Sequence, residues 1–201
     1  MSVPLAILDR DGTIIDIVRD EETGAISVAF HPDQLRLLAG AVEGMRALQD
    51  AGFTLAIATN QPAPAKGLFS ADAVLRTNDA LVEKLGRAGV SIAAVEVCMH
   101  HPEGGQGGDA ALVGPCDCRK PGPGMLNALV KRLDADRART WMIGDATGDL
   151  EAGRTAGIKT GLVFAQNRCE LCPLRAGPAS LLPDVHGATL LEVARGIIRH
   201  G

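Results

Sequence analysis

Aromatic residues are scarce in this sequence, which contains no Tyr, one Trp and four Phe among 201 residues. Proteins that bind single-stranded nucleic acid stack bases on aromatic side chains, so this scarcity argues against that function. Positive charge is not in excess either, because the formal net charge is −4. The chain therefore lacks the basic footprint that binding to nucleic acid or to a membrane surface requires. An anionic substrate would need cations concentrated locally.

Long apolar runs are also missing. No run approaches the roughly 20 residues of a membrane-spanning helix, and the N-terminus lacks a basic segment followed by an apolar one. We therefore expect a cytoplasmic protein with no membrane or nucleic-acid partner, and we expect a monomer. In the cytoplasm the five cysteines are reduced, which favours metal binding or catalysis over disulfides.

The hydrophobic content of 46% is that of a globular protein, and we expect a single domain over residues 1–201 without a large cap domain. Strand-like apolar runs alternate with helix-like segments. The alternation predicts an α/β fold, a Rossmann-like parallel sheet with helices on both faces. Residues 16–32 form either a flap-like hairpin or an ordinary surface excursion. The predicted strands are 5–8, 54–58, 91–97, 140–143 and 159–164, and the predicted helices are 41–51, 70–88, 123–133, 148–156 and 190–198.

Polar residues follow the predicted strands at their carboxyl ends. Asp9 and Asp11 follow the first strand, Thr59 the second and Asp145 the fourth, and Lys120 precedes a helix. The carboxyl ends of parallel strands meet at one edge of the sheet, where ligands bind. Carboxylates with a hydroxyl and a lysine suit phosphoryl transfer, and hard oxygen ligands beside a phosphate favour Mg²⁺. We therefore predict a magnesium-dependent phosphoryl-transfer site.

Four motifs in this order, DxDx[TV], Thr, Lys and GDxxxD, resemble those of the haloacid dehalogenase superfamily of phosphohydrolases. The resemblance implies that Asp9 is the nucleophile that forms an aspartyl-phosphate and that Asp11 is the general acid and base. It implies that Thr59 and Lys120 bind the transferring phosphoryl group. Magnesium would be bound by Asp9, by the backbone carbonyl of Asp11 and by Asp145.

The same resemblance implies supporting roles for two further residues of these motifs. Asp149 is expected to orient either Lys120 or a metal-bound water. Thr13 is expected to assist the site, although a turn residue is an alternative interpretation.

A second constellation consists of Cys98, His100, Cys116 and Cys118, two close pairs separated by a glycine-rich stretch. Three thiolates and an imidazole are the ligands of a tetrahedral, structural Zn²⁺ site. The metal would replace the hydrophobic core that the loop 98–118 lacks. His101 is a competing ligand.

The two remaining cysteines, Cys169 and Cys172, form a CxxC motif. Two reduced thiols in a loop, a disulfide and an intersubunit metal site all remain open for this pair.

The order C-x-H, C-x-C and then Arg119-Lys120-Pro121 resembles a capless branch of the superfamily. That branch contains heptose-bisphosphate and histidinol-phosphate phosphatases. In the heptose enzymes a TNQSGIARG loop follows the second strand, and here it reads TNQPAPAKG. Pro62 and Pro64 stiffen this loop and remove two backbone donors. The residues predicted to bind phosphate or substrate are Thr59, Asn60, Gln61, Lys66, Arg119 and Lys120.

A bisphosphate substrate needs a second cluster of positive charge besides Lys120. Arg119 and Lys66 are the candidates, unless Arg119 pairs with Asp117. We therefore predict a magnesium-dependent sugar-bisphosphate phosphatase. The resemblance implies that it removes the C7 phosphate of D-glycero-D-manno-heptose 1,7-bisphosphate on the route to nucleotide-activated heptose. The alternatives are a histidinol-phosphate phosphatase and a non-catalytic binding protein on the same fold.

Overall fold

A six-stranded parallel sheet forms the centre of the molecule. The computed structural model describes residues 2–19, 22, 26–164 and 182–200. The strand order is β5-β4-β1-β6-β7-β8, and every neighbouring pair is parallel. The predicted α/β fold is therefore confirmed. The strands are β1 (Val3–Leu8), β4 (Thr54–Asn60), β5 (Ala94–Cys98), β6 (Ala135–Gly144), β7 (Lys159–Val163) and β8 (Val185–Gly187).

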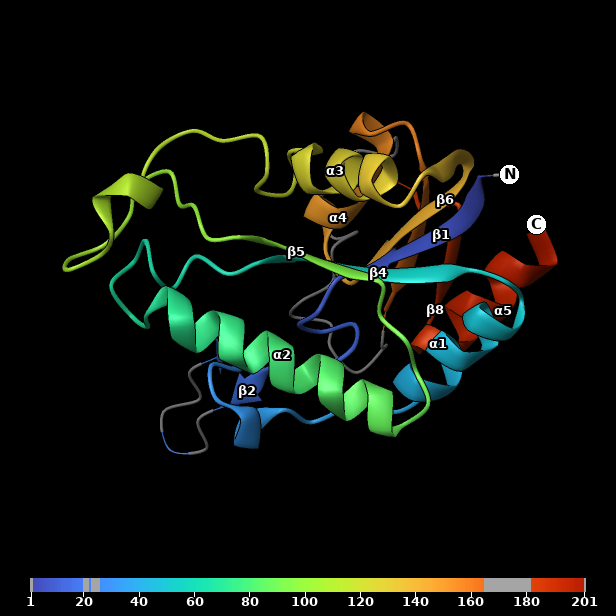
Figure 1. Cartoon of the computed structure of the whole chain (residues 1–201), viewed down its shortest axis with the longest axis horizontal. Helices are drawn as coiled ribbons and strands as arrows, with labels where there is room; N and C mark the ends of the chain where they lie inside the picture. Colours follow the sequence, from blue (N-terminus) through green and yellow to red (C-terminus); the bar gives the residue numbers. More distant parts are fainter. Residues whose placement is uncertain (1, 20–21, 23–25, 165–181, 201) are drawn as a thin grey trace.

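Helices cover both faces of the sheet (Figure 1). One face packs against α1 (Ala41–Asp50), α2 (Ala71–Arg87) and α5 (Leu190–His200), and the other packs against α3 (Gly124–Arg132) and α4 (Thr147–Thr155). Successive side chains of a strand point to opposite faces. The core is accordingly two apolar layers, each made from alternate residues of the same buried strands.

The predicted elements agree with the structure except at several boundaries and one strand. Ser70 begins α2 as expected, with its hydroxyl accepting from the backbone N–H of Ala73 at 3.2 Å. The strand predicted at 91–97 begins only at Ala94, and β6 begins at Ala135 instead of residue 140. The short edge strand β8 was not predicted, because three residues are too few to show a periodicity.

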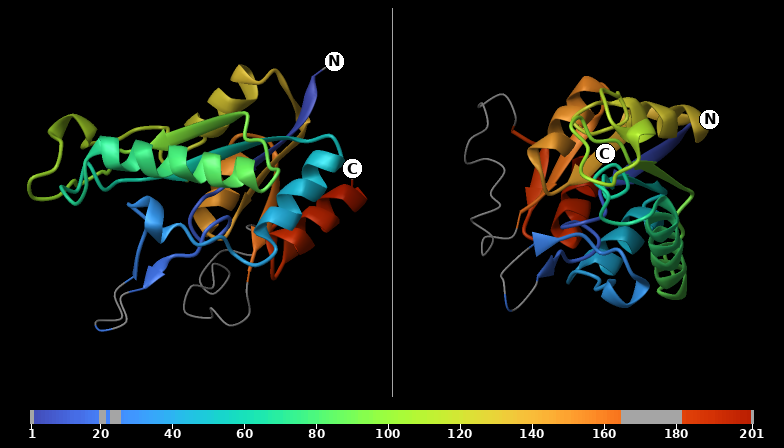
Figure 2. Two further views of the ribbon diagram at one scale, coloured as in Figure 1. Left: turned by 60° about the horizontal axis from the view of Figure 1, so that its bottom comes forward. Right: turned by 90° about the vertical axis from the view of Figure 1, so that its left-hand side faces the viewer.

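Residues 16–32 contain a short antiparallel hairpin of β2 (Val18–Arg19) and β3 (Ile26–Ser27), followed by the 3₁₀ turn η1 (Pro32–Gln34). We call the described residues of 16–32 the flap. The views of Figures 1 and 2 place it next to α2, on the same side of the sheet as α1. A hairpin was one of the two expectations for this segment.

The glycine-rich loop 98–118 projects at the end of the molecule farthest from both termini (Figure 2). No residue from 99 to 119 is buried, although this stretch includes the 3₁₀ turn η2 (Ala110–Leu112). The loop contacts the loop after β4 through a backbone hydrogen bond from Asp109 N–H to Pro64 O at 3.0 Å. Across the described part of the chain, no helix is long and apolar enough to cross a membrane.

Candidate active site

The three central strands bring the predicted site residues to one edge. β1 lies between β4 and β6, so the residues at the carboxyl ends of these strands are neighbours in space. The backbone N–H of Asp9 donates to Ile143 O at 2.8 Å, which extends the β1–β6 ladder to the first carboxylate. Asp9, Thr59 and Asp145 therefore meet at the carboxyl edge, as the parallel fold requires.

Two glycines make room for the carboxylates. Gly12 has a φ of +85°, and a Cβ built on it would lie 2.0 Å from Oδ2 of Asp145. A Cβ on Gly144 would lie 2.1 Å from Oδ2 of Asp149. Any larger residue at either position would displace an acidic side chain from the site.

Lys120 is the cation at the centre of the site. Its buried Nζ lies 2.6 Å from Oδ1 of Asp9 and 2.6 Å from Oδ1 of Asp149, and it donates to Ala58 O at 2.8 Å. The negative charges of Asp149 and Asp9 raise the pKa of Lys120 above its ordinary value and outweigh burial, which acts in the opposite direction. The ammonium group therefore stays charged.

Asn60 holds the backbone of Lys120 in place. The side-chain amide of Asn60 donates to Lys120 O at 2.9 Å, and its carbonyl accepts from Lys120 N–H at 3.0 Å. Both polar groups of Asn60 are thus engaged by the chain itself. A direct contact of Asn60 with phosphate remains a prediction.

Asp9, Asp145 and Asp149 form a cluster of carboxylates whose oxygen atoms lie within 4.8 Å of one another. Burial raises the pKa of Asp9 to about 7 and that of Asp145 to about 8, and neighbouring carboxylates add to both shifts. Lys120 lowers the pKa of both. A hard cation that binds carboxylate oxygens would relieve the repulsion among these three side chains, so the residues fit Mg²⁺.

Asp149 also shapes the start of α4. Its Oδ2 accepts from the backbone N–H of Ala146 at 3.1 Å while its Oδ1 contacts Lys120. Of the two expected roles for Asp149, the structure displays the contact with Lys120.

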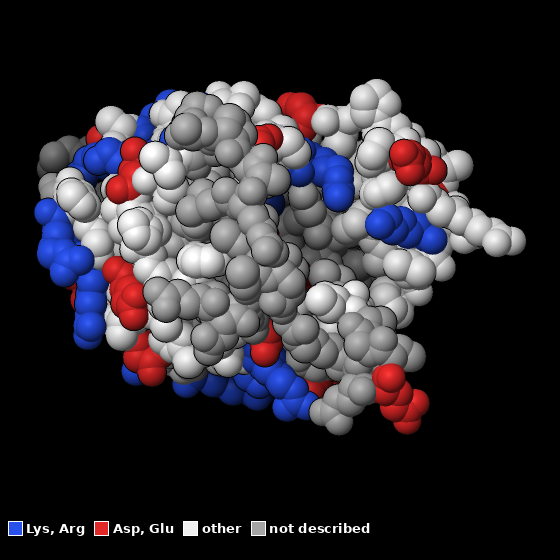
Figure 3. All heavy atoms as spheres, turned by 180° about the vertical axis from the view of Figure 1, so that it is seen from behind, with Lys and Arg blue, Asp and Glu red and all other residues white. Residues whose placement is uncertain are grey.

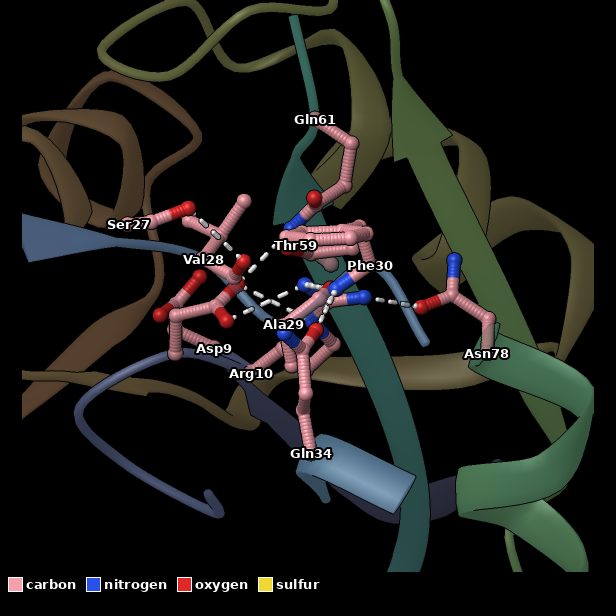
Figure 4. A network of polar contacts seen from close by, with 12 residues as sticks. Asp9, Arg10, Ser27, Val28, Ala29, Phe30, Gln34, Thr59, Gln61 and Asn78 are labelled. Atoms are coloured by element: carbon pink, nitrogen blue, oxygen red, sulfur yellow. Dashed lines mark hydrogen bonds and ion pairs between the residues drawn. The ribbon is translucent and has the colours of Figure 1, made fainter. Parts of the chain in front are cut away.

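The side chain of Asp11 lies outside the carboxylate cluster found among the described residues. Gln61 Nε2 donates to Oδ2 of Asp11 at 2.7 Å and to Oγ1 of Thr59 at 2.9 Å. Gln61 thus links the second strand end to the first motif, with its side chain next to Thr59 (Figure 4). The sequence comparison assigned Asp11 a metal contact only through its backbone carbonyl, and that role remains a prediction.

Thr13 is completely buried, and its Oγ1 has no hydrogen-bond partner in the described part of the chain. It lines a small cavity together with Gly12 and Asp145. A buried hydroxyl without a partner beside the carboxylates is compatible with the expected helper role, which stays a prediction.

Cationic side chains gather near the glycine-rich loop. Burial lowers the pKa of His101, and the positive charges of Lys66 and Arg119 lower it further. Neither Lys66 nor Arg119 forms an ion pair with a described residue, Asp117 included; the Arg119 guanidinium reaches only the carbonyl of His100, at 3.5 Å. Figure 3 shows Lys and Arg side chains at the edge of a hollow on the face opposite to that of Figure 1. His101 was not predicted to belong to this group.

The loop 98–118 brings its four predicted zinc ligands together. The ligand atoms of Cys98, His100, Cys116 and Cys118 lie within 4.8 Å of one another, and His100 presents Nδ1 to Cys118 Sγ at 3.4 Å. His101 instead accepts backbone N–H groups through its Nδ1 and is not part of the cluster. Burial raises the pKa of the Cys98 and Cys118 thiols. A metal that binds thiolates would offset that cost, so the donor set fits Zn²⁺. Cys169 and Cys172 lie outside the described residues.

Known proteins provide an independent comparison. Residues 117–188 match the family model described as HAD-hydrolase-like. The D-glycero-beta-D-manno-heptose-1,7-bisphosphate 7-phosphatase of Rhodopseudomonas palustris is 39% identical over 155 residues, which are 77% of this chain and 80% of the relative. The chain belongs to this phosphatase family. The Yersinia pestis member is 33% identical over 79% of both chains.

Solved structures support this family membership. The D,D-heptose 1,7-bisphosphate phosphatase from B. bronchiseptica, complexed with magnesium and phosphate, superposes with a TM-score of 0.77 and 30% identity. The alignment covers 100% of each chain. The resemblance to the haloacid dehalogenase superfamily is therefore confirmed, and the protein is a phosphoric monoester hydrolase of that superfamily.

Proposed function

We propose that the protein is a magnesium-dependent phosphatase that removes the C7 phosphate of D-glycero-D-manno-heptose 1,7-bisphosphate. The observation that carries the proposal is the 39% identity, over 77% of the chain, with a relative named for this reaction. The product would enter the synthesis of nucleotide-activated heptose. A cytoplasmic location fits, because it keeps the thiols of the Cys/His cluster reduced.

Asp9 would start the reaction. One of its carboxylate oxygens attacks phosphorus, the bond from phosphorus to the C7 oxygen breaks, and the leaving oxygen takes a proton from Asp11. Asp11 then removes a proton from water, which attacks the aspartyl-phosphate. Inorganic phosphate leaves and the Asp9 carboxylate is restored.

The residues around Asp9 supply the electrostatic part of this scheme. Lys120 is held by Asp149 and by the Ala58 carbonyl, so its charge is already in place where phosphoryl oxygens gather. The Thr59 hydroxyl would bind another of these oxygens. Magnesium, bound by Asp9, Asp145 and the Asp11 carbonyl, would neutralise phosphate charge and keep Asp9 ionised.

The remote phosphate would be bound by Arg119 and Lys66. Both cations are without a carboxylate partner among the described residues, and the charge of each acts on His101. The second phosphate of a bisphosphate would neutralise these two positive charges, whereas the cationic imidazole of histidinol phosphate would be repelled by them. Zinc at Cys98, His100, Cys116 and Cys118 would fix the loop that leads directly into Arg119.

Phosphate release from a substrate panel tests the proposal. The panel contains both anomers of the heptose bisphosphate, fructose 1,6-bisphosphate and histidinol phosphate, each with and without Mg²⁺. We expect magnesium-dependent release with a clear preference for a heptose bisphosphate. A preference for histidinol phosphate, or no release from any substrate, would overturn it.

Two variants accompany the panel. Asp9→Asn should abolish turnover, because an amide is a poor nucleophile. Asp11→Asn should retain substrate binding and lower kcat by roughly two orders of magnitude, the usual range for a lost general acid and base. Near-normal turnover by Asp9→Asn would contradict the covalent mechanism.

A further inference from the structure

Arg10 lies between Asp9 and Asp11 in sequence, and its side chain has no exposed surface. It is one of the largest completely buried side chains of the described chain. A buried guanidinium is costly unless nearly all of its N–H groups find acceptors. Its partners therefore indicate what the residue is built to hold.

The first partner is the Asp11 carboxylate. Arg10 Nε lies 2.9 Å from Oδ2 of Asp11, and Nη2 donates to Oδ1 at 3.0 Å. The planar fork of the guanidinium engages both oxygens and fixes the plane of the carboxylate. Gln61 is the third donor to this carboxylate and binds it at Oδ2.

The other two partners come from distant parts of the chain. Nη1 of Arg10 donates to Oδ1 of Asn78 on α2 at 2.7 Å, and Nη2 also donates to the carbonyl of Ala29 at 2.9 Å. Ala29 belongs to the flap. Figure 4 shows the Arg10 side chain among these groups, with Asn78 on one side and the flap residues across it.

Contacts of the residues that follow Ala29 hold this part of the flap in place. The ring of Phe30 stacks on that of Phe69, with centroids 3.7 Å apart and planes 14° apart. Oε1 of Gln34 accepts the backbone N–H groups of Phe30 and His31. The position of Ala29 O therefore depends on the flap being packed against the loop after β4.

We propose that Arg10 is a positioning residue that fixes the Asp11 carboxylate and ties its orientation to the docked flap. The inference rests on the proposed function, in which Asp11 moves the proton. In this scheme Arg10 neither binds the substrate nor transfers a proton, and it acts only through the Asp11 carboxylate. Its side chain joins the catalytic loop, the flap and α2 through one rigid group.

A double-mutant cycle tests whether Arg10 acts through Asp11. Arg10→Lys keeps the charge and loses the fork. We expect kcat to fall about 10- to 100-fold, the scale of a misplaced catalytic group, with KM within a few-fold of the parent. In the Asp11→Asn background the same change should have almost no further effect, because its target is already gone. Arg87→Lys, at an exposed pair with Glu83, is the matched control and should leave kcat unchanged.

A second cycle tests the link to the flap and keeps the inference open to refutation if Arg10→Lys folds poorly. Phe69→Leu removes the stack on Phe30 at a half-buried loop position. It should lower kcat with Asp11 present and have little effect in Asp11→Asn.

Additive losses in both cycles would show that Arg10 is merely structural and would overturn the inference. That outcome differs from failure of the proposed function, in which the parent enzyme itself would release no phosphate from the panel. Thermal unfolding of each variant accompanies the kinetics, and a fall of kcat that tracks the melting temperature equally in both backgrounds would also count against it.

Discussion

At the scale of single residues, the sequence indicated which residues lie at the site but not which partners each of them contacts. The carboxylates and Lys120 could be assigned from sequence, because each follows a strand or precedes a helix in an α/β pattern. The partners of Arg10 and Asn60 could not be assigned. Asn60 contacts a residue 60 positions away, and Arg10 contacts Asn78 over 68 positions. Such pairings depend on packing, for which one sequence has no periodic signal.

Arg119 offers the sharpest test at this scale. In the proposed function Arg119 binds the remote phosphate, so Arg119→Ala should remove a charge-assisted contact worth about 1.5–3 kcal/mol and lower kcat/KM for a bisphosphate roughly 10- to 100-fold. Efficiency on p-nitrophenyl phosphate should change little, because that substrate has no second phosphate.

Lys120→Ala is the contrasting variant, because Lys120 lies against Asp9 and should matter for both substrates. The ratio of the two efficiencies is the quantity to measure in each variant. An equal loss on both substrates in Arg119→Ala would place Arg119 at the reaction centre or in the scaffold.

At the scale of elements, the sequence predicted the helices better than the strands. Helices α1, α2 and α5 each span ten or more residues, long enough to show an apolar stripe. The edge strand β8 has three residues and was missed, and none of the first five residues of β6 is buried. These segments form strands because they pair with neighbouring strands in the folded protein, and their local sequence pattern does not indicate it.

The loop 98–118 is the element whose order we expect to depend most on the proposed zinc. Cys116→Ser should abolish tight zinc binding, because a closed site needs all four ligands. With no buried residue between 99 and 119 to hold it, the loop should then lose protection against hydrogen exchange. Activity should fall as well, because Arg119 and Lys120 follow Cys118 directly.

Metal analysis of protein purified without chelator is the direct measurement, and about one zinc per chain is expected. Cys169→Ser is the control, since Cys169 is not one of the four predicted ligands. Wild-type protein free of zinc, yet with a protected loop, would contradict the structural role of the metal.

At the scale of the whole molecule, the carboxylate cluster affects stability. The pKa of Asp9 is raised to about 7 and that of Asp145 to about 8, from an ordinary value of 3.8. Above pH 4 the unfolded chain releases protons that the folded protein retains. The stabilising contribution of Asp9 and Asp145 to the folded state is therefore fully present below about pH 4 and is lost as the pH rises through 7 to 8.

Magnesium-free protein should accordingly melt at lower temperature as the pH rises from 5 to 9, and added Mg²⁺ should restore the melting temperature most strongly above pH 8. Asp145→Asn removes one of the two groups and should flatten the pH dependence. Thermal unfolding with and without Mg²⁺ is the measurement. A Mg²⁺ effect that is unchanged in Asp145→Asn would count against a metal site at this cluster.

The close approach of Gly12 and Gly144 to the carboxylates limits which mutations the gene can accumulate at these two positions. Every single-base missense change in a glycine codon yields a residue with a Cβ, and at these positions a Cβ would lie about 2 Å from an acidic oxygen. Both codons are thus closed to substitution while the activity is under selection, although neither residue has a functional group. A mutagenesis library that selects for activity on new sugar phosphates can keep both glycines unchanged and vary the loop 62–69 instead.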